Sequence, residues 1–240
     1  MNELSKRLID TGSPLRIHLI GVAGSGMSGL ALLLLGMGHK VSGSDRVTSG
    51  ETTRMQGLGL VFSSPHTPEA VNGADLVVFS SAIKPDNPAY AAAVEHGIPL
   101  FRRAECLGAI LHTRKGVVIS GTHGKTTTSA MTAHVLREAG LAPSHYVGAE
   151  IPILGANAKW SADGEFMVAE GDESDGTLAL YRPEHSVILN IEAEHLDFYR
   201  DLDHIREVFT KLADQTSGKL IYCAEDEVAN DLCSAREDAI

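Results

Sequence analysis

The sequence predicts an α/β protein with an N-terminal Rossmann-like parallel sheet, followed by a partial P-loop-type α/β domain. Two observations predict this fold. Short apolar runs rich in β-branched residues alternate with helical stretches along most of the chain. Two of these runs lead directly into glycine-rich turns, at residues 21–29 and 121–124. Strands that alternate with helices are typical of parallel sheets with helical crossovers.

The first unit is expected to begin with a strand at 16–20, a glycine-rich turn and a leucine-rich helix that ends near Met37. Further strands are expected at 39–43, 60–62, 75–79 and 99–101, and helices at 51–58, 88–96 and 102–112. Residues 1–14 are polar and predict a loose leader or a short helix. The strand at 16–20, the helix after it and the strand at 39–43 form a βαβ unit, and the further alternation implies a parallel, doubly wound sheet.

The second unit repeats the alternation. It is expected to contain strands at 116–120, 144–147, 166–169, 186–191 and 219–223, with helices at 125–139 and 204–216. The segment 113–115 separates the two units. We therefore expect a first domain at 1–114 and a second, incomplete domain at 115–240.

Composition limits the classes of function. The net charge of −11 over 240 residues argues against general binding to nucleic acids or anionic membranes. The longest apolar run, at 30–35, is too short to cross a bilayer. Cys106, Cys223 and Cys233 form no CxxC pair, and the polar N-terminus lacks a secretory pattern. We expect a cytoplasmic protein with reduced thiols.

The segment after the strand at 116–120 indicates a nucleotide phosphate site. A strand that feeds a glycine turn at a helix start presents backbone N–H groups and a helix dipole to an anion. The candidate ATP-binding residues are Gly121, Thr122, His123, Gly124, Lys125, Thr126 and Thr127. Lys125 would contact the outer phosphates, and the Thr126 hydroxyl suits a Mg²⁺ ligand. Ile119 stands where the full motif has a glycine, so this is a shortened variant; the alternative is a helix-opening turn with an incidental lysine.

The first glycine-rich turn indicates a second ligand site. Gly24, Gly26 and Gly29 match G-x-G-x-x-G, and Asp45 follows Gly21 by 24 positions (45 minus 21). The glycines would let the backbone approach a diphosphate, and Asp45 could accept hydrogen bonds from a sugar. Candidate residues for this site are Gly24, Ser25, Gly26, Met27, Asp45, Ser80 and Ser81. A tight turn without a ligand is the alternative.

Acidic residues and a histidine follow two strands of the second unit. Asp172 and Glu173 come after the strand at 166–169, and His195 comes after the strand at 186–191. A magnesium ion bound to nucleotide phosphates needs one or two carboxylates at this end of a sheet. A solvated acidic loop and a capping histidine are the alternatives.

Six motifs, taken together, resemble the Mur ligases. They are Ile-His-Leu-Ile-Gly-Val-Ala-Gly-Ser-Gly-Met-Ser-Gly at 17–29, Ser-Gly-Ser-Asp at 42–45, Ser-Ser-Ala-Ile at 80–83, Gly-Thr-His-Gly-Lys-Thr-Thr at 121–127, Ala-Glu-Gly-Asp-Glu-Ser-Asp at 169–175 and Asn-Ile-Glu-Ala-Glu-His-Leu-Asp at 190–197. They occur in family order and cover nearly the whole chain. Three departures are Ala23, Gly171 and Glu194, where the family more often has glycine, alanine and aspartate.

The resemblance implies an ATP- and Mg²⁺-dependent ligase of peptidoglycan precursor synthesis. Its motifs look most like those of the member that joins L-alanine to the carboxylate of UDP-N-acetylmuramate through an acyl phosphate. By resemblance, Lys125, Glu173 and His195 are catalytic, and Thr126, Glu173 and His195 hold magnesium. The residues of the first glycine turn, with Asp45 and Ser80–Ser81, would line the UDP-sugar site.

The resemblance also implies a third domain that nothing after residue 240 supplies, so we expect the chain alone to be inactive. Three alternatives stay open. One is the family member that recycles a murein tripeptide onto the same UDP-sugar. Another is a non-catalytic fragment that binds UDP-sugar and ATP. A P-loop kinase or GTPase would leave the first unit without a role.

Overall fold

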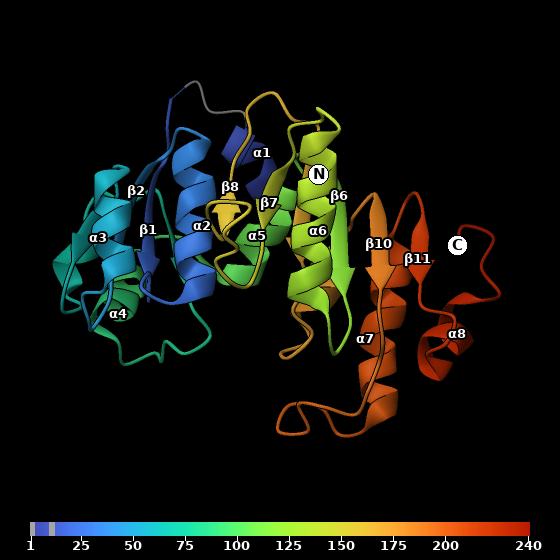
Figure 1. The fold of residues 1–240 in the computed structure, drawn as a ribbon. Helices are drawn as coiled ribbons and strands as arrows, with labels where there is room; N and C mark the ends of the chain where they lie inside the picture. The colour runs from blue at the N-terminus through green and yellow to red at the C-terminus, as the bar shows by residue number, and fades with distance from the viewer. Residues whose placement is uncertain (1–2, 10–12) are drawn as a thin grey trace.

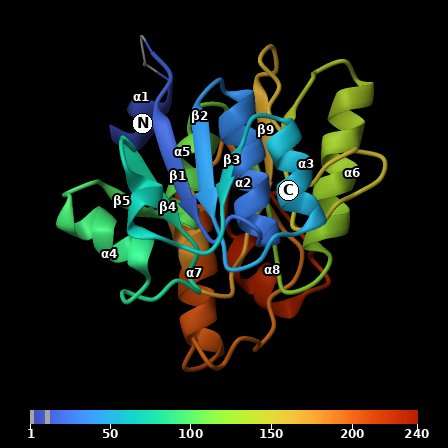
Figure 2. The ribbon, with the colours of Figure 1, turned by 90° about the vertical axis from the view of Figure 1, so that its left-hand side faces the viewer.

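The computed structural model describes residues 3–9 and 13–240, which form two parallel-type sheets side by side (Figure 1). The first sheet has the order β3-β2-β1-β4-β5, and all its pairs are parallel. Its strands are β1 (Arg16–Ile20), β2 (Lys40–Ser44), β3 (Val61–Ser63), β4 (Leu76–Phe79) and β5 (Leu100–Arg102). Figure 2 turns this sheet toward the viewer, with β5 near one edge.

The helices around this sheet begin and end where local signals place them. They are α1 (Glu3–Ile9), α2 (Ser25–Gly36), α3 (Gly50–Gly57), η1 (Pro68–Val71), α4 (Pro88–Glu95) and α5 (Arg103–Leu111). Ser49 and Thr52 form a capping box on α3, and Asn87 caps α4, whose first residue is proline. Of the expected leader, residues 1–2 and 10–12 lie outside the described residues, and α1 is the short helix.

The second sheet has the order β11-β10-β6-β9-β7-β8. Its strands are β6 (Lys115–Ser120), β7 (Ser144–Tyr146), β8 (Ala158–Lys159), β9 (Phe166–Glu170), β10 (His185–Ile188) and β11 (Leu220–Tyr222). All its pairs are parallel except β7 with the edge strand β8. The accompanying helices are α6 (Lys125–Glu138), η2 (Thr177–Leu180), α7 (Leu202–Gln215) and α8 (Glu227–Cys233).

The predicted α/β class with a parallel first sheet is confirmed, and most elements differ from expectation by one or two residues. One strand differs more. The strand expected to reach Ile191 ends at Ile188. Leu189 N still donates to Ser120 O at 3.0 Å, but the backbone of Asn190 turns to accept a hydrogen bond from Thr122 N. The antiparallel strand β8 and the helix α8 were not expected.

The helix α2 lies between the two sheets and joins them into one core. Its residues from Met27 to Leu34 are all buried, which explains why the leucine run carries no polar face. The largest apolar cluster contains residues of both sheets, including Leu33 of α2, Tyr146 of β7 and Met167 of β9. Burying one such leucine side chain contributes about 1.5–3 kcal/mol. No helix in the described ranges has the length and apolar character needed to cross a membrane.

Candidate functional site

The turn between β6 and α6 is a loop with two glycines in the left-handed region. Gly121 has φ 137° and Gly124 has φ 84°, conformations that glycine adopts without the steric cost of a side chain. A Cβ on Gly121 would also lie 3.0 Å from Asn190 N. Gly124 precedes the first residue of α6, so the free N–H groups of the first helical turn face this loop.

Asn190, just past β10, holds this loop in place. Its backbone oxygen accepts a hydrogen bond from Thr122 N at 3.0 Å. Its side-chain Oδ1 accepts one from His123 N at 2.7 Å, and its Nδ2 donates to His123 O at 3.2 Å. The His123 ring lies 3.6 Å from a carboxylate oxygen of Glu194. The loop is therefore shaped by the neighbouring strand end as well as by its own sequence.

Lys125 reaches back over the loop. Its Nζ donates to Gly121 O at 2.6 Å, to Thr122 O at 3.0 Å and to Glu173 Oε1 at 2.9 Å. The Lys125 side chain is only 17% exposed, and that of Glu173 is 4% exposed. Two loop carbonyls and one carboxylate therefore hold the ammonium group beside the loop. The structure thus brings two of the predicted catalytic residues into direct contact.

Glu173 has one carboxylate oxygen without a partner. Its Oε2 is buried and makes no hydrogen bond. Burial raises the pKa of Glu173 above its usual value, while the hydrogen bond and charge of Lys125 oppose that rise. His195 Nε2 lies 3.6 Å from Glu173 Oε1. His195, the third predicted catalytic residue, therefore belongs to the same cluster. The Tyr199 hydroxyl donates a hydrogen bond to Glu173 O and so holds the backbone of that residue.

Thr126 contacts a carboxylate that the sequence analysis did not select. Its Oγ1 donates to Glu170 Oε1 at 2.9 Å, and Gly148 N donates to Glu170 Oε2 at 2.6 Å. Glu170 is the last residue of β9. A signal for it exists in the sequence, because alternate strand residues share a face. Val168 packs with Ala130 of α6, so Glu170 on the same face of the strand must lie near the start of that helix.

Asp172, the other predicted carboxylate of this segment, is engaged elsewhere. Its Oδ1 accepts hydrogen bonds from the N and Oγ of Ser174 at 3.0 and 2.6 Å. Its Oδ2 forms an ion pair with Arg103 Nη2 at 3.1 Å. Burial alone would raise the pKa of Asp172, but these contacts outweigh it and lower the pKa. Asp172 therefore shapes the loop in which Glu173 lies.

The residues present fit a magnesium ion bound together with a nucleotide. Within residues 3–9 and 13–240, no three His, Cys, Asp or Glu side chains are arranged to hold a metal by themselves. Magnesium in nucleotide sites takes only one or two carboxylates and completes its shell with phosphate oxygens and water. The unpartnered oxygen of Glu173 and the Thr126–Glu170 pair supply oxygen ligands of that kind.

The candidate UDP-sugar residues meet at the carboxyl edge of the first sheet. Asp45 accepts hydrogen bonds from Ala23 N at 2.9 Å and from Arg46 N at 2.7 Å, so its carboxylate first serves to hold the turn. A Cβ on Gly21 would lie 3.3 Å from Ser80 Cβ. Met27 as a whole residue is 2% exposed and belongs to the core, so it packs beneath the turn.

Two glycines of the G-x-G-x-x-G turn face the second sheet. A Cβ on Gly26 would lie 3.0 Å from Tyr146 Oη, and one on Gly29 would lie 3.0 Å from Tyr146 Cε2. Asn157 Nδ2 donates to Ser25 O at 3.0 Å. The close packing of this turn against β7 and β8 therefore explains why Gly26 and Gly29 lack side chains. A role in binding a diphosphate is not needed for that explanation.

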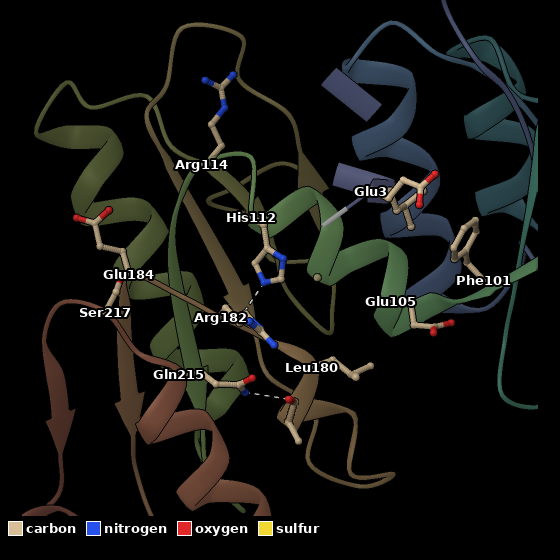
Figure 3. A pocket seen from close by; sticks show the side chains of 13 residues that line it. Glu3, Phe101, Glu105, His112, Arg114, Leu180, Arg182, Glu184, Gln215 and Ser217 are labelled. Carbon is tan, nitrogen blue, oxygen red and sulfur yellow. Dashed lines mark hydrogen bonds between the residues drawn. The ribbon is translucent and has the colours of Figure 1, made fainter. Parts of the chain in front are cut away.

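Cavities lie both at this edge and away from it. A cavity of about 400 Å³ lies beside the ends of β4 and β5, and Ser81, Arg103 and Asp175 are among its lining residues. A larger one of about 770 Å³ lies between α1, α5, η2 and the end of α7 (Figure 3). In it His112 Nε2 accepts from Arg182 N at 3.0 Å. None of the predicted site residues lines the larger cavity.

The fold and site together define a class of protein: a two-sheet α/β protein with a glycine loop at a helix start, a lysine reaching back over it and carboxylates at the neighbouring strand end, the arrangement typical of phosphate sites. Comparison of sequences gives the family. The profile described as "Mur ligase family, catalytic domain" matches residues 16–115, and the one described as "Mur ligase middle domain" matches residues 119–239. The chain belongs to the Mur ligase family.

Two curated relatives carry the same name. A UDP-N-acetylmuramate–L-alanine ligase of Syntrophobacter fumaroxidans is 47% identical over 214 residues, which cover 88% of this chain and 45% of that protein. One of Desulfatibacillum aliphaticivorans is 44% identical, over 90% of this chain and 48% of that protein. The chain therefore spans about half the length of the curated relatives it matches.

Solved structures agree on the family. The UDP-N-acetylmuramate–alanine ligase of Thermotoga maritima matches with a TM-score of 0.84 at 30% identity, over 91% of this chain and 51% of that one. The UDP-N-acetylmuramate:L-alanyl-γ-D-glutamyl-meso-diaminopimelate ligase of Neisseria meningitides matches with a TM-score of 0.85 at 28% identity, over 92% and 74% of the two chains. The fold alone does not separate the two activities.

Proposed function

We propose that this chain is the UDP-sugar-binding and ATP-binding part of a ligase that joins L-alanine to UDP-N-acetylmuramate. One observation carries the proposal: Lys125, Glu173 and His195 form one cluster beside the Thr126–Glu170 pair, at the mouth of a loop built for phosphate. The curated relatives bear the name of that activity. The chemistry of the cluster suits phosphoryl transfer to a carboxylate.

In this proposal the loop from Gly121 to Thr127 binds the phosphates of ATP. Lys125 releases its loop carbonyls and neutralises the γ-phosphate, which leaves Glu173 free to turn toward a cation. Magnesium, when bound, neutralises charge on the transferred phosphoryl group. Thr126, Glu170, Glu173 and His195 are the residues that would hold it.

The ligation itself divides into two steps. The muramate carboxylate attacks the γ-phosphorus of ATP, which gives an acyl phosphate and ADP. The amine of L-alanine then attacks the acyl carbon and expels phosphate. The cavity of about 400 Å³ is lined by Ser81 of the first unit and by Asp175 and Thr177 of the second, so a sugar carboxylate held there would lie beside the loop that carries Glu173. The chain's residues act here by positioning and charge neutralisation.

The domain boundary near residue 114 and a cytoplasmic location belong to the same proposal. The boundary is supported by the change of sheet between β5 and β6. The location is supported by the three free cysteines, because such thiols are typical of a reducing compartment.

Binding of ATP tests the proposal in the chain itself. Calorimetric titration with Mg²⁺-ATP should show one site, and Lys125→Met should weaken it about 10- to 150-fold, since charge-assisted hydrogen bonds contribute about 1.5–3 kcal/mol. Lys211→Met is the matched control, because Lys211 is exposed on α7. Equal affinities of the two variants would overturn the role of Lys125.

A second titration separates the ligase from its relatives. UDP-N-acetylmuramate should bind the chain without ATP, because its candidate residues lie on the first sheet. In the whole protein, phosphate release with this sugar should depend on L-alanine. Dependence on L-alanyl-γ-D-glutamyl-meso-diaminopimelate instead would favour the activity named for the Neisseria structure.

A further inference from the structure

The first glycine turn and the acidic loop of the second sheet are joined by a continuous chain of contacts. The Tyr146 hydroxyl donates to Gly26 O at 2.9 Å. Arg103 Nη1 donates to that same hydroxyl at 3.2 Å, and Arg103 Nη2 pairs with Asp172 Oδ2 at 3.1 Å. Each contact in this chain crosses from one sheet's elements to the other's.

This joint is packed as well as hydrogen-bonded. Tyr146 is 4% exposed, and the Arg103 side chain is 18% exposed. Cβ atoms on Gly26 and Gly29 would lie 3.0 Å from the Tyr146 side chain. A side chain at either glycine would therefore press on Tyr146, and Tyr146 contacts the guanidinium of Arg103.

The far end of the joint reaches the nucleotide cluster. Asp172 Oδ1 accepts hydrogen bonds from the backbone N and the Oγ of Ser174. These bonds fix the short turn that contains the residue between Asp172 and Ser174. That residue is Glu173, the carboxylate that binds Lys125 at 2.9 Å. A displacement of Arg103 is thus transmitted to Glu173 through one loop residue.

We propose that Arg103 is a positioning residue that couples occupancy of the UDP-sugar turn to the geometry of the Mg²⁺-ATP loop. The inference rests on the proposed function, because it takes those two ligands for the two sites. Arginine suits the position since its rigid fork binds two partners at fixed angles, which a lysine cannot do. The proposal assigns cooperative binding to Arg103, which is not among the candidate ligand residues of either site but lines the cavity of about 400 Å³ beside them.

Cooperativity has a direct measurement. Mg²⁺-ATP affinity is measured by calorimetry with and without saturating UDP-N-acetylmuramate, in the chain and in the variants Arg103→Met, Arg103→Lys and Tyr146→Phe. In the unaltered chain the sugar nucleotide should tighten Mg²⁺-ATP binding about fivefold or more. Arg103→Met should bring that ratio close to one. Because Arg103 also lines the cavity of about 400 Å³, the affinity of each variant for the sugar nucleotide is measured first, and saturation is set from that value.

Arg103→Lys and Tyr146→Phe test the same coupling in two further ways. Arg103→Lys preserves the charge and should also give a ratio near one, so a misfolded Arg103→Met would not end the test. Tyr146→Phe removes the hydroxyl that links Gly26 to Arg103 and should give an intermediate ratio. Arg206→Met, at a surface pair with Asp231 (3.9 Å), is the control and should leave the ratio unchanged.

Two failures are distinguishable. If neither ligand binds the unaltered chain, the proposed function fails. If both bind but the ratio is close to one, or if it survives unchanged in Arg103→Met and Arg103→Lys, the coupling role of Arg103 is wrong and the contact only holds the two sheets together.

Discussion

His18 gives the chain a stability that depends on pH. It lies on β1, 1% exposed, with its ring nitrogens 2.9 Å from Ser42 Oγ and 3.0 Å from Ser44 Oγ. Burial, with a smaller contribution from the charge of His66, lowers its pKa from 6.5 to about 4. Between these values the unfolded chain binds a proton that the folded chain does not. The free energy of unfolding must therefore fall as the pH falls through this window.

The size of the effect follows from the two pKa values. Their difference is 2.5 (6.5 minus 4). At about 1.36 kcal/mol per pKa unit, the complete effect is about 3 kcal/mol. About 2 kcal/mol of it falls between about pH 7 and about pH 4.5. This is a large fraction of the 5–15 kcal/mol by which domains are typically stable.

Urea unfolding followed by circular dichroism measures the effect. His39, His66, His112 and His145 also have lowered pKa values, for which burial is the leading cause. His39, His112 and His145 act equally in the unaltered chain and in His18→Gln, so their effects cancel in the difference. His66 shares the Ser44 hydroxyl with His18 and contributes to its lowered pKa, so the difference reports His18 together with this smaller coupling. The variant should lose about 2 kcal/mol less on acidification. His96→Gln, at an exposed site, is the control. Parallel pH profiles of the chain and His18→Gln would refute the reasoning.

Two further predictions concern packing and charge. Gly36→Ala should cost about 1–3 kcal/mol, because its Cβ would lie 2.6 Å from Trp160 Cβ, whereas Gly57→Ala meets nothing within 4 Å and should gain about 0.4–1 kcal/mol. Urea curves of both variants check this, and changes of the same sign would contradict it. Lys125→Met should raise the pKa of Glu173 further, since the charge that opposes the effect of burial is removed. The folded variant then holds its proton to higher pH, so its free energy of unfolding should fall more as the pH rises above 4.5. A carbon-13 NMR titration of the Glu173 carboxyl would show the midpoint, and an unmoved or lowered midpoint would count against the assignment.

Local patterns were sufficient to predict the glycine turn and the helix start at residues 121–125. Gly121 and Gly124 adopt positive φ, as a glycine turn before a helix demands, and Lys125 lies at the first turn of α6. The parallel first sheet also followed from alternation alone. Both features depend on residues close together in the chain, and such residues leave a readable spacing.

Contacts between distant segments left no such spacing. Tyr146 and Gly26 are 120 positions apart, and Arg103 and Asp172 are 69 apart. Nothing near Gly26 in the sequence shows that its missing side chain makes room for Tyr146. Asn190 was likewise not predictable, because its contact with His123 spans 67 positions. The strand ends early because the backbone oxygen of Asn190 accepts from Thr122 N. Glu170 is different, because strand alternation placed it on the face toward α6.

The central claim is that the loop beginning at Gly121 binds a nucleoside triphosphate whose magnesium is held by Thr126 and the strand-end carboxylates. The most direct test is calorimetric titration of ATP, with and without Mg²⁺, into the chain and into Glu170→Gln and Thr126→Val. Magnesium should tighten ATP binding to the unaltered chain, and both variants should lose most of that tightening while still binding free ATP. A magnesium dependence unchanged in both variants would contradict the claim.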